Sequence, residues 1–260
     1  MRVPIYQVDA FADRLFTGNP AAVCPLEEWL PAETMQAIAE ENNLAETAFF
    51  VASGKDFDIR WFTPKAEVDL AGHPTLATAH TLFTEIEPGR TCVRFHTKLG
   101  DTLTVVAENG VLTMDFPSRP PSPSDDIDAV AEALGARPSK FMAARDGFAV
   151  FESESDVRAL KPDMTKLMAL KYMGVIATAP GVEVDFVSRF FAPAHSIPED
   201  PVTGSAHCES IPYWSEILGK TKLVARQISP RGGTVYCEYL GDRVKIGGRA
   251  VTFMRGEIEI

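Results

Sequence analysis

The stretch VDLAGHPTLATAH (residues 68–80) places Gly72, His73 and Pro74 between an apolar run and a helical pattern. A second stretch, PEDPVTGSAHC (residues 198–208), has the same plan, with Pro201 and Gly204 ahead of another helical pattern. Glycine lets a ligand approach the backbone closely, and proline suits a turn or the first turn of a helix. We interpret the two stretches as equivalent turns of two half-domains that face each other across one site.

An internal repeat supports this equivalence. When the sequence is shifted by 129 residues, Arg60 falls on Arg189, Phe62 on Phe191 and, further on, Ala77 on Ala206. Between the halves, PSRPPSPSDD (residues 117–126) is rich in Pro and Ser and has no apolar periodicity, which is typical of a linker. We therefore predict an N-terminal lobe over residues 1–116 and a C-terminal lobe over 127–260, leaving open a return of the last strand to the N-terminal lobe.

The hydrophobic pattern predicts strands and helices in similar order in both halves. The pair Asn109-Gly110 predicts a tight hairpin turn. The main predicted strands are 3–11, 19–26, 44–53, 56–64, 174–180 and 183–193, and the main predicted helices are 30–42, one from about Thr75, 127–136, 163–172 and one through 208–218.

Composition and charge exclude several classes of protein. The net charge is −11 over 260 residues, and the basic residues are scattered, so the sequence predicts no nucleic-acid partner and no anionic membrane partner. No apolar run reaches membrane-spanning length, and the N-terminus has no signal-peptide pattern. The four cysteines are far apart, so we expect free thiols and a cytoplasmic protein.

The two turns suggest an anion-binding function. The start of a helix offers backbone N–H groups without partners and the positive end of the helix dipole, which together bind a carboxylate or phosphate. Two such helix starts would hold a small anionic substrate. The simpler interpretation, two ordinary helix caps, stays open at this point.

Four side chains are candidates for proton transfer or substrate contact. Glu46 lies in an apolar strand, where burial would raise its pKa and suit it to acid–base work, unless it is an edge residue facing water. His73 either donates to a substrate oxygen or to Glu46, or is a cap or core histidine. Asp200 either caps the second helix or holds a substrate amine or hydroxyl, and Ser205 either caps or contacts the ligand.

Other chemistries lack their motifs. The histidines and acids near residue 200 do not have metal-ligand spacing, and the chain has no GxSxG, no Walker loop and no GxGxxG between a strand and a helix. The sequence therefore predicts no metal site and no dinucleotide-binding site.

At these residues the sequence resembles the PhzF-like family, the isomerase type of phenazine biosynthesis. The resemblance covers nearly the whole chain. It is carried by VDAFADRLFTGNPAAV (8–23), NLAETAFF (43–50), RWFTPKAEVDLAGHPTLATAH (60–80), EDPVTGSAHC (199–208) and the PYW of the following helix.

The resemblance implies an α+β fold like that of diaminopimelate epimerase: two pseudo-symmetric lobes, each a curved, mostly antiparallel sheet around a central helix, with the site between them. It also implies a homodimer without cofactor or metal. The family's catalytic glutamate, histidine and aspartate correspond to Glu46, His73 and Asp200. The predicted substrate-binding residues are Gly72, Pro74, Thr75, Gly204, Ser205 and Asn19.

The resemblance further implies a reaction. Related epimerases carry a cysteine in each turn, whereas this chain has Gly72 and Asp200 there, which disfavours a two-thiol mechanism. We expect a cofactor-independent isomerase that uses one glutamate on a small carboxylate-bearing substrate. The alternatives are a two-base epimerase using Glu46 and Asp200, and a catalytically silent binding or scaffold protein. Glu209 and Ser210 replace small apolar residues common in the family, with consequences that depend on where they face.

Overall fold

The computed structural model describes residues 1–260, which form two compact units. Unit 1 comprises Met1–Asp115 and Gly247–Ile260, and unit 2 comprises Phe116–Ile246. The segment 117–126 lies in unit 2, where β9 (Ser122–Pro123) pairs antiparallel with β10 (Lys140–Ala143). The last strand, β18 (Ala250–Glu259), lies in unit 1.

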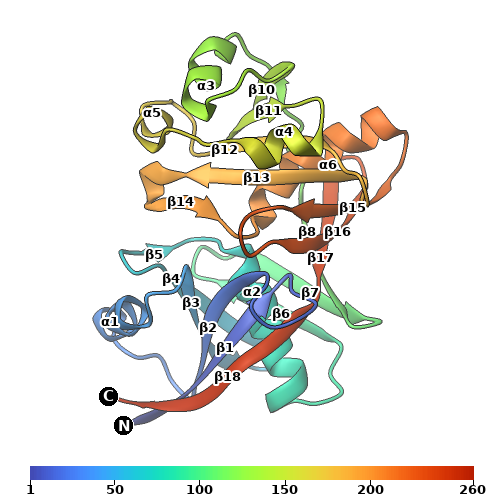
Figure 1. The fold of residues 1–260 in the computed structure, drawn as a ribbon. Coiled ribbons are helices and arrows are strands. Elements are labelled where there is room, and N and C mark those ends of the chain that lie inside the picture. The colour runs from blue at the N-terminus through green and yellow to red at the C-terminus, as the bar shows by residue number, and fades with distance from the viewer. The chain divides into compact units, whose positions relative to one another are not determined.

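Unit 1 is built from strands that pair mainly with neighbours in the sequence. β1 lies between β18 and β2, and Figure 1 shows both chain ends at that pairing. β2 runs parallel to β3, β3 pairs antiparallel with β4, and β4 runs parallel to β6. The remaining bounds are β1 (Arg2–Ala10), β2 (Asn19–Leu26), α1 (Ala32–Asn42), β3 (Glu46–Ser53), β4 (Asp56–Phe62), β5 (Glu67–Val68), α2 (Gly72–Thr81), a π-helical segment (Leu82–Ile86), β6 (Cys92–Thr97), β7 (Thr102–Glu108) and β8 (Val111–Pro117).

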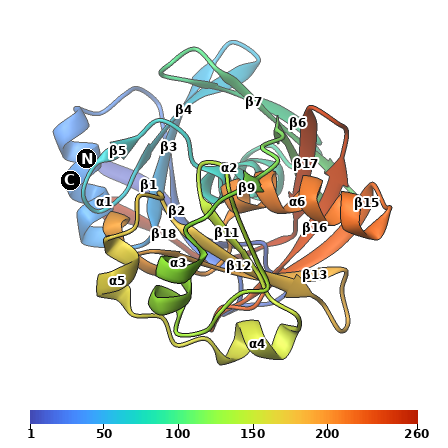
Figure 2. The same cartoon turned by 90° about the horizontal axis from the view of Figure 1, so that it is seen from above.

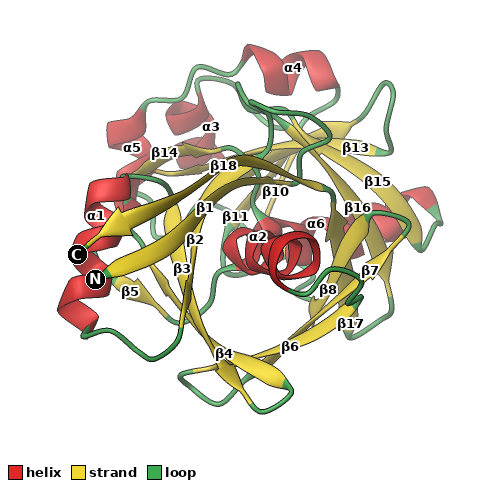
Figure 3. Ribbon diagram, turned by 90° about the horizontal axis from the view of Figure 1, so that it is seen from below, coloured by secondary structure: helices red, strands yellow, loops and turns green.

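Helix α2 is the central helix of unit 1. Figure 3 views it nearly end-on, with strands of unit 1 curving past it. From His73 to Ala79 every residue is buried, as expected for a helix covered on all sides. The buried Thr75, Thr78 and Thr81 each donate a hydroxyl hydrogen to the carbonyl four residues earlier, which satisfies these polar groups inside the core.

Unit 2 repeats the same order of pairings. β11 runs parallel to β12, β12 pairs antiparallel with β13, and β13 runs parallel to β15, as β2, β3, β4 and β6 do in unit 1. The bounds are α3 (Ile127–Leu134), β11 (Gly147–Val150), α4 (Glu154–Ala159), α5 (Met164–Met168), β12 (Val175–Pro180), β13 (Phe186–Ala192), a 3-10 turn (Pro193–His195), β14 (Ile197–Asp200), α6 (Gly204–Leu218), β15 (Lys222–Gln227), β16 (Gly233–Tyr239) and β17 (Arg243–Gly248).

The sheet of unit 2 is covered on both faces. Along β12, Val175 and Ala177 face the helices α3, α4 and α5, while Ile176 faces the central helix α6. Figure 2 shows α3, α4 and α5 on one side of β12 and β13 and α6 on the other. Alternating side chains therefore supply both apolar cores of this unit.

The predicted fold class is confirmed, because each unit is a mostly antiparallel sheet with a central helix. The Asn109-Gly110 hairpin is also confirmed, with φ values of 51° and 76° between β7 and β8. One boundary was wrong: α2 begins at Gly72 and not near Thr75. Pro74 lies third in the helix, where a missing N–H costs no hydrogen bond. None of the helices is long and apolar enough to span a membrane.

Candidate active site

The first turn of interest opens α2. Its N-cap residue, Ala71, is extended, and no side chain caps the helix. Gly72 and His73 therefore begin the helix with backbone N–H groups that no side-chain cap satisfies, and Pro74 has no N–H to satisfy. This is the arrangement expected of a helix start that binds a carboxylate.

Glu46 and His73 meet beside this turn. Glu46 is the first residue of β3, opposite Ala21 of the parallel strand β2, and His73 is the second residue of α2. The imidazole Nε2 lies 3.2 Å from the Glu46 Oε2, and both side chains are largely buried. The pair lacks the alignment of a formed hydrogen bond, as is common for catalytic groups whose contacts tighten on substrate binding.

His73 is a neutral imidazole. Burial lowers its pKa to about 3, an effect only partly offset by a hydrogen bond to the backbone of Pro20. Because Nε2 faces Glu46 and Pro20 offers only a carbonyl, the donor to Pro20 is Nδ1–H. In this tautomer Nε2 carries a lone pair, so it is an acceptor for a hydrogen bond from the protonated carboxyl group of Glu46 and does not form a permanent ion pair with it.

The other two predicted residues of unit 1 are also fully buried. Asn19 begins β2, opposite Ala10 of β1. Thr75 uses its hydroxyl hydrogen on the Ala71 carbonyl, at 2.6 Å. Their contact with substrate stays a prediction.

The second turn is held by a hydrogen-bonded cage around Asp200. The Thr203 hydroxyl donates to Asp200 Oδ2 at 2.5 Å. The Gln227 side chain donates to the Asp200 carbonyl at 2.7 Å and accepts from the Thr203 N–H at 2.9 Å. The N-cap residue of α6 is Thr203, so the alternative of Asp200 as the helix cap was wrong. Asp200 lies three residues before this cap, and its carboxylate fixes the turn by accepting the hydrogen bond from Thr203.

Gly204 and Ser205 form the first turn of α6. No atom lies within 4 Å of the position that a Cβ on Gly204 would take, and its backbone has no positive φ. Internal packing therefore does not require glycine here. The Ser205 hydroxyl accepts a hydrogen bond from Arg145 Nη2 at 2.9 Å.

Behind Arg145 lies a pair of fully buried carboxyl groups, Asp146 and Glu209. Arg145 Nη2 also contacts Asp146 Oδ2 at 3.0 Å, and the Asp146 N–H donates to Glu209 Oε1 at 3.2 Å. Burial, and then the charge of Asp146, raise the pKa of Glu209 to about 7. Glu209, whose orientation the sequence left open, thus faces the protein interior.

Neither turn contains a cysteine, and the nearest along α6 is Cys208, whose Sγ lies 3.9 Å from the Gly204 carbonyl oxygen. Cys24, Cys208 and Cys237 are buried and Cys92 is exposed. Burial raises the pKa of the Cys208 thiol to about 11, so it is no source of a thiolate. No group of three or more His, Cys, Asp or Glu side chains lies close enough together to hold a metal ion.

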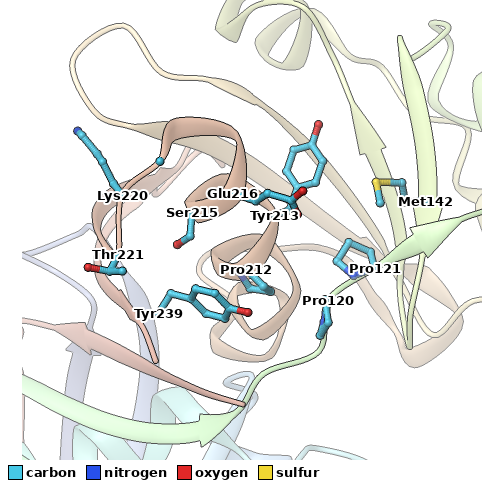
Figure 4. Close-up of a pocket in the computed structure, with 11 residues that line it drawn as sticks. Pro120, Pro121, Met142, Pro212, Tyr213, Ser215, Glu216, Lys220, Thr221 and Tyr239 are labelled. Atoms are coloured by element: carbon cyan, nitrogen blue, oxygen red, sulfur yellow. The ribbon is translucent and has the colours of Figure 1, made fainter. Parts of the chain in front are cut away.

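One cavity of unit 2 contains none of the predicted site residues. It has a volume of about 380 Å³ and lies beside the C-terminal half of α6. Figure 4 shows its walls, which include Pro212 and Tyr213 of α6 and Tyr239 of β16. Its walls do not hold a pair of titratable groups in contact.

Sequence reasoning missed Pro20, Arg145, Asp146 and Gln227. Pro20 acts through its backbone carbonyl, which no sequence pattern reveals. Gln227 ends an apolar strand, and Arg145-Asp146 lies in a β-turn where charged residues are usually solvated. For Gln227 the only signal in the sequence was a polar residue at the end of a strand. Such residues are too common to indicate a site.

Comparison with known proteins agrees with the fold. The model of the family "Phenazine biosynthesis-like protein" matches residues 8–256. An uncharacterised isomerase of Pseudomonas aeruginosa is 47% identical over 260 residues, covering all of both chains. The crystal structure of a PhzF-family phenazine biosynthesis protein of Enterococcus faecalis is 46% identical, with a TM-score of 0.97 over the full length of both chains. A hydroxyproline epimerase of Agrobacterium vitis shares the fold at 10% identity, with a TM-score of 0.61 over 99% of this chain and 92% of its own.

Proposed function

The chain belongs to the PhzF family of phenazine biosynthesis-like proteins, and from this premise we propose that it is a cofactor-independent isomerase. It moves a proton between two carbons of a small carboxylate-bearing substrate. Glu46 is the group that carries the proton. The relatives named as isomerases support the reaction class, and the geometry around Glu46 supports the mechanism.

The single observation that carries this proposal is the contact between Glu46 and a neutral His73. Glu46 takes a proton from a substrate carbon and returns it to another carbon on the same face. His73 holds the carboxyl group through Nε2, while Pro20 fixes the tautomer of the ring. A positioned acid–base group of this kind contributes about a hundredfold to ten-thousandfold to the rate.

Substrate binding falls to the two helix starts. We propose that the first-turn N–H groups of Gly72 and His73 hold the substrate carboxylate and stabilise the charge that develops on it. Pro74, Thr75 and Asn19 shape this part of the site. Asp200, Gly204 and Ser205 are the proposed substrate-binding residues of unit 2, and they suit an amine or hydroxyl.

A two-base epimerase is the second candidate, and one observation favours it. Asp200 is buried, and its carboxylate accepts a hydrogen bond from the neutral Thr203 hydroxyl. A carboxylate in this setting is a possible second base. Epimerisation would invert one carbon, whereas isomerisation would move a double bond.

Incubation of the protein with a panel of small carboxylic acids in D₂O tests the proposal. The expected result is incorporation of deuterium at one carbon with a shifted double bond, detected by NMR. Deuterium at an inverted carbon would favour the epimerase. If no compound exchanges, the scaffold interpretation gains support. If the Glu46→Gln protein exchanges as fast as the wild type, the glutamate mechanism is wrong.

A further inference from the structure

We propose that unit 2 carries a further ligand site, the cavity beside the C-terminal half of α6, and that its ligand is a small amine with a ring. The ring lies between the prolines and tyrosines of the walls, and the ammonium group pairs with Glu216. The cavity contains none of the residues that the proposed function uses, so the two proposals are independent of each other.

The cavity has the size and the walls of a small-molecule site. Its volume of about 380 Å³ is sufficient, since such sites usually measure about 300 to 1,000 Å³. The walls are formed largely by rings, those of Pro120, Pro121, Pro212, Tyr213 and Tyr239. Proline has no side-chain rotamers to lose and tyrosine has few, so a ligand ring can pack against these walls at a low entropic cost.

A proline inside α6 explains why the wall of Pro120 and Pro121 is fixed. Pro212 has no N–H, so the Cys208 carbonyl four residues earlier lacks its helical donor. The Arg119 N–H donates to this carbonyl at 2.9 Å, which fastens the proline segment to the helix. Directly after this segment, β9 pairs with β10. The wall is therefore held at both ends, and the cavity is formed before a ligand binds.

Ser215 provides a polar group that the chain itself does not use. This residue is only 6% exposed, and its hydroxyl has no hydrogen-bond partner within the chain. Ser210 of the same helix, by contrast, donates to the Ala206 carbonyl at 2.9 Å. Figure 4 shows the Ser215 hydroxyl on the side of Thr221 and Tyr239, which also line the cavity. A buried hydroxyl without a partner is unfavourable, so a ligand that hydrogen-bonds to it gains affinity.

The charges on the walls favour a cation. Lys220 is already paired, since its Nζ lies 2.5 Å from Asp185 Oδ1. Glu216 is exposed and has no cation of the chain within ion-pair distance, so its carboxylate is the unpaired charge of the cavity. Burial, and then the charge of Glu216, raise the pKa of Tyr213, so this carboxylate acts on the tyrosine beside it. A carboxylate and a tyrosine ring both attract an ammonium group.

Tyramine, tyrosol and phloretate are suitable probes, with binding to the full chain measured by calorimetry. The three share a phenol ring on a short chain, and the chain ends in an ammonium, a hydroxyl or a carboxylate group respectively. We expect tyramine to bind about fivefold to twentyfold more tightly than tyrosol, and phloretate to bind most weakly. Equal binding of the three, tighter binding of phloretate, or no measurable binding of tyramine at about 10 mM would overturn the proposal.

Two variants and a control locate the binding. Glu216→Gln should remove most of the preference for tyramine and leave the binding of tyrosol unchanged. Ser215→Ala should weaken the binding of all three probes by about threefold to tenfold, because it removes a hydrogen bond to the ligand. Glu41→Gln is the matched control, since Glu41 is exposed but does not line the cavity, and it should bind the probes like the wild type.

A stability measurement separates a binding role of Ser215 from a structural one. Ser215→Ala should not lower the free energy of unfolding in urea, because its hydroxyl makes no hydrogen bond within the chain. A preference for tyramine that survives Glu216→Gln, or Ser215→Ala binding that equals the wild type, contradicts this site. Deuterium exchange on the carboxylic acid panel is measured separately, so failure of either proposal leaves the other unaffected.

Discussion

The turn that precedes α2 and the turn that precedes α6 differ in their chemistry but share a structural frame. This frame is an arginine–glutamate ion pair whose arginine lies over a phenylalanine ring. In unit 1, Arg60 makes two hydrogen bonds to Glu67, at 2.7 Å and 2.9 Å. In unit 2, Arg189 makes the same two bonds to Glu199, at the same distances. Each arginine also lies over an aromatic ring, that of Phe62 or Phe191 respectively.

Beyond the frame the two turns diverge. The first continues to the contact between Glu46 and His73, and the second to the cage of Asp200, Thr203 and Gln227. The shared ion pair thus has a structural role, since it fixes the loop between strand and helix in both units. In the proposed function, the groups that differ carry the specialised roles, with proton transfer in the first turn and substrate holding in the second.

The largest expected effect breaks this division of roles. Glu46→Gln should lower kcat about a thousandfold, because the amide cannot carry the proton. Asp200→Asn should mainly raise KM, because it alters substrate holding. Steady-state kinetics on the substrate found in the carboxylic acid panel measures both.

Glu41→Gln is the matched control, since Glu41 is exposed at the end of α1. It should retain wild-type kinetics. Equal losses of kcat in Glu46→Gln and Asp200→Asn would favour the two-base epimerase and contradict the separation of roles between the turns.

The shared frame predicts unequal losses of stability. Arg189→Met should lower the free energy of unfolding by about 3 kcal/mol, since Arg189 also donates to the carbonyls of Val157 and Leu160. Arg60→Met should cost only about 1 to 2 kcal/mol, because Lys98 still pairs with Glu67 at 3.0 Å. Urea denaturation measures both values, and the reverse order would refute this explanation.

The cage in unit 2 predicts a smaller effect. Gln227→Ala should lower the free energy of unfolding by about 2 kcal/mol and raise KM, because it removes the side chain that hydrogen-bonds the Thr203 N–H and the Asp200 carbonyl. Gln36→Ala in unit 1 is the matched control, since Gln36 makes one part-buried hydrogen bond to the Thr63 carbonyl. It should cost less than about 1 kcal/mol and leave KM unchanged. Equal losses of stability in Gln227→Ala and Gln36→Ala would contradict the claim that the cage around Asp200 fixes the second turn.

The smallest effect concerns pH. The folded protein keeps His73 neutral down to about pH 3, whereas the unfolded chain binds a proton below about 6.5. Stability from this residue is therefore complete above pH 6.5 and is lost on acidification, at about 1.4 kcal/mol per pH unit. His73→Asn should remove that slope.

The comparison of wild type with His73→Asn at about pH 7 and about pH 5 isolates this contribution. Glu209 acts with the opposite sign, since its raised pKa makes the folded state bind a proton that the unfolded state releases. Both proteins contain Glu209, so its contribution cancels. An identical acid slope in the two proteins would show that His73 is not held neutral.

Much of the fold could be predicted because its signals are local. The apolar run of β3, the alternation within β4, the Asn109-Gly110 turn and the repeat that relates Arg60 to Arg189 are all visible in the sequence. The start of α2 was misplaced because Pro74 resembles a residue before a helix, whereas it occupies the third helical position.

The candidate site was only partly predictable. The family resemblance indicated Glu46, His73, Asp200 and Ser205, but not what holds them. Gln227 reaches Asp200 because β15 pairs in parallel with β13, placing Gln227 opposite Ser188. Such partners are set by tertiary packing between distant segments, for which a single sequence gives no local signal.

Transfer of isotope within one substrate molecule tests the central claim most directly. Substrate deuterated at the carbon that loses its proton is converted in ordinary water, and the product is analysed by NMR and mass spectrometry. If Glu46 alone carries the proton, part of the deuterium appears at the carbon that gains it. Complete loss of the label, with inversion at the original carbon, would contradict the account and require a second base.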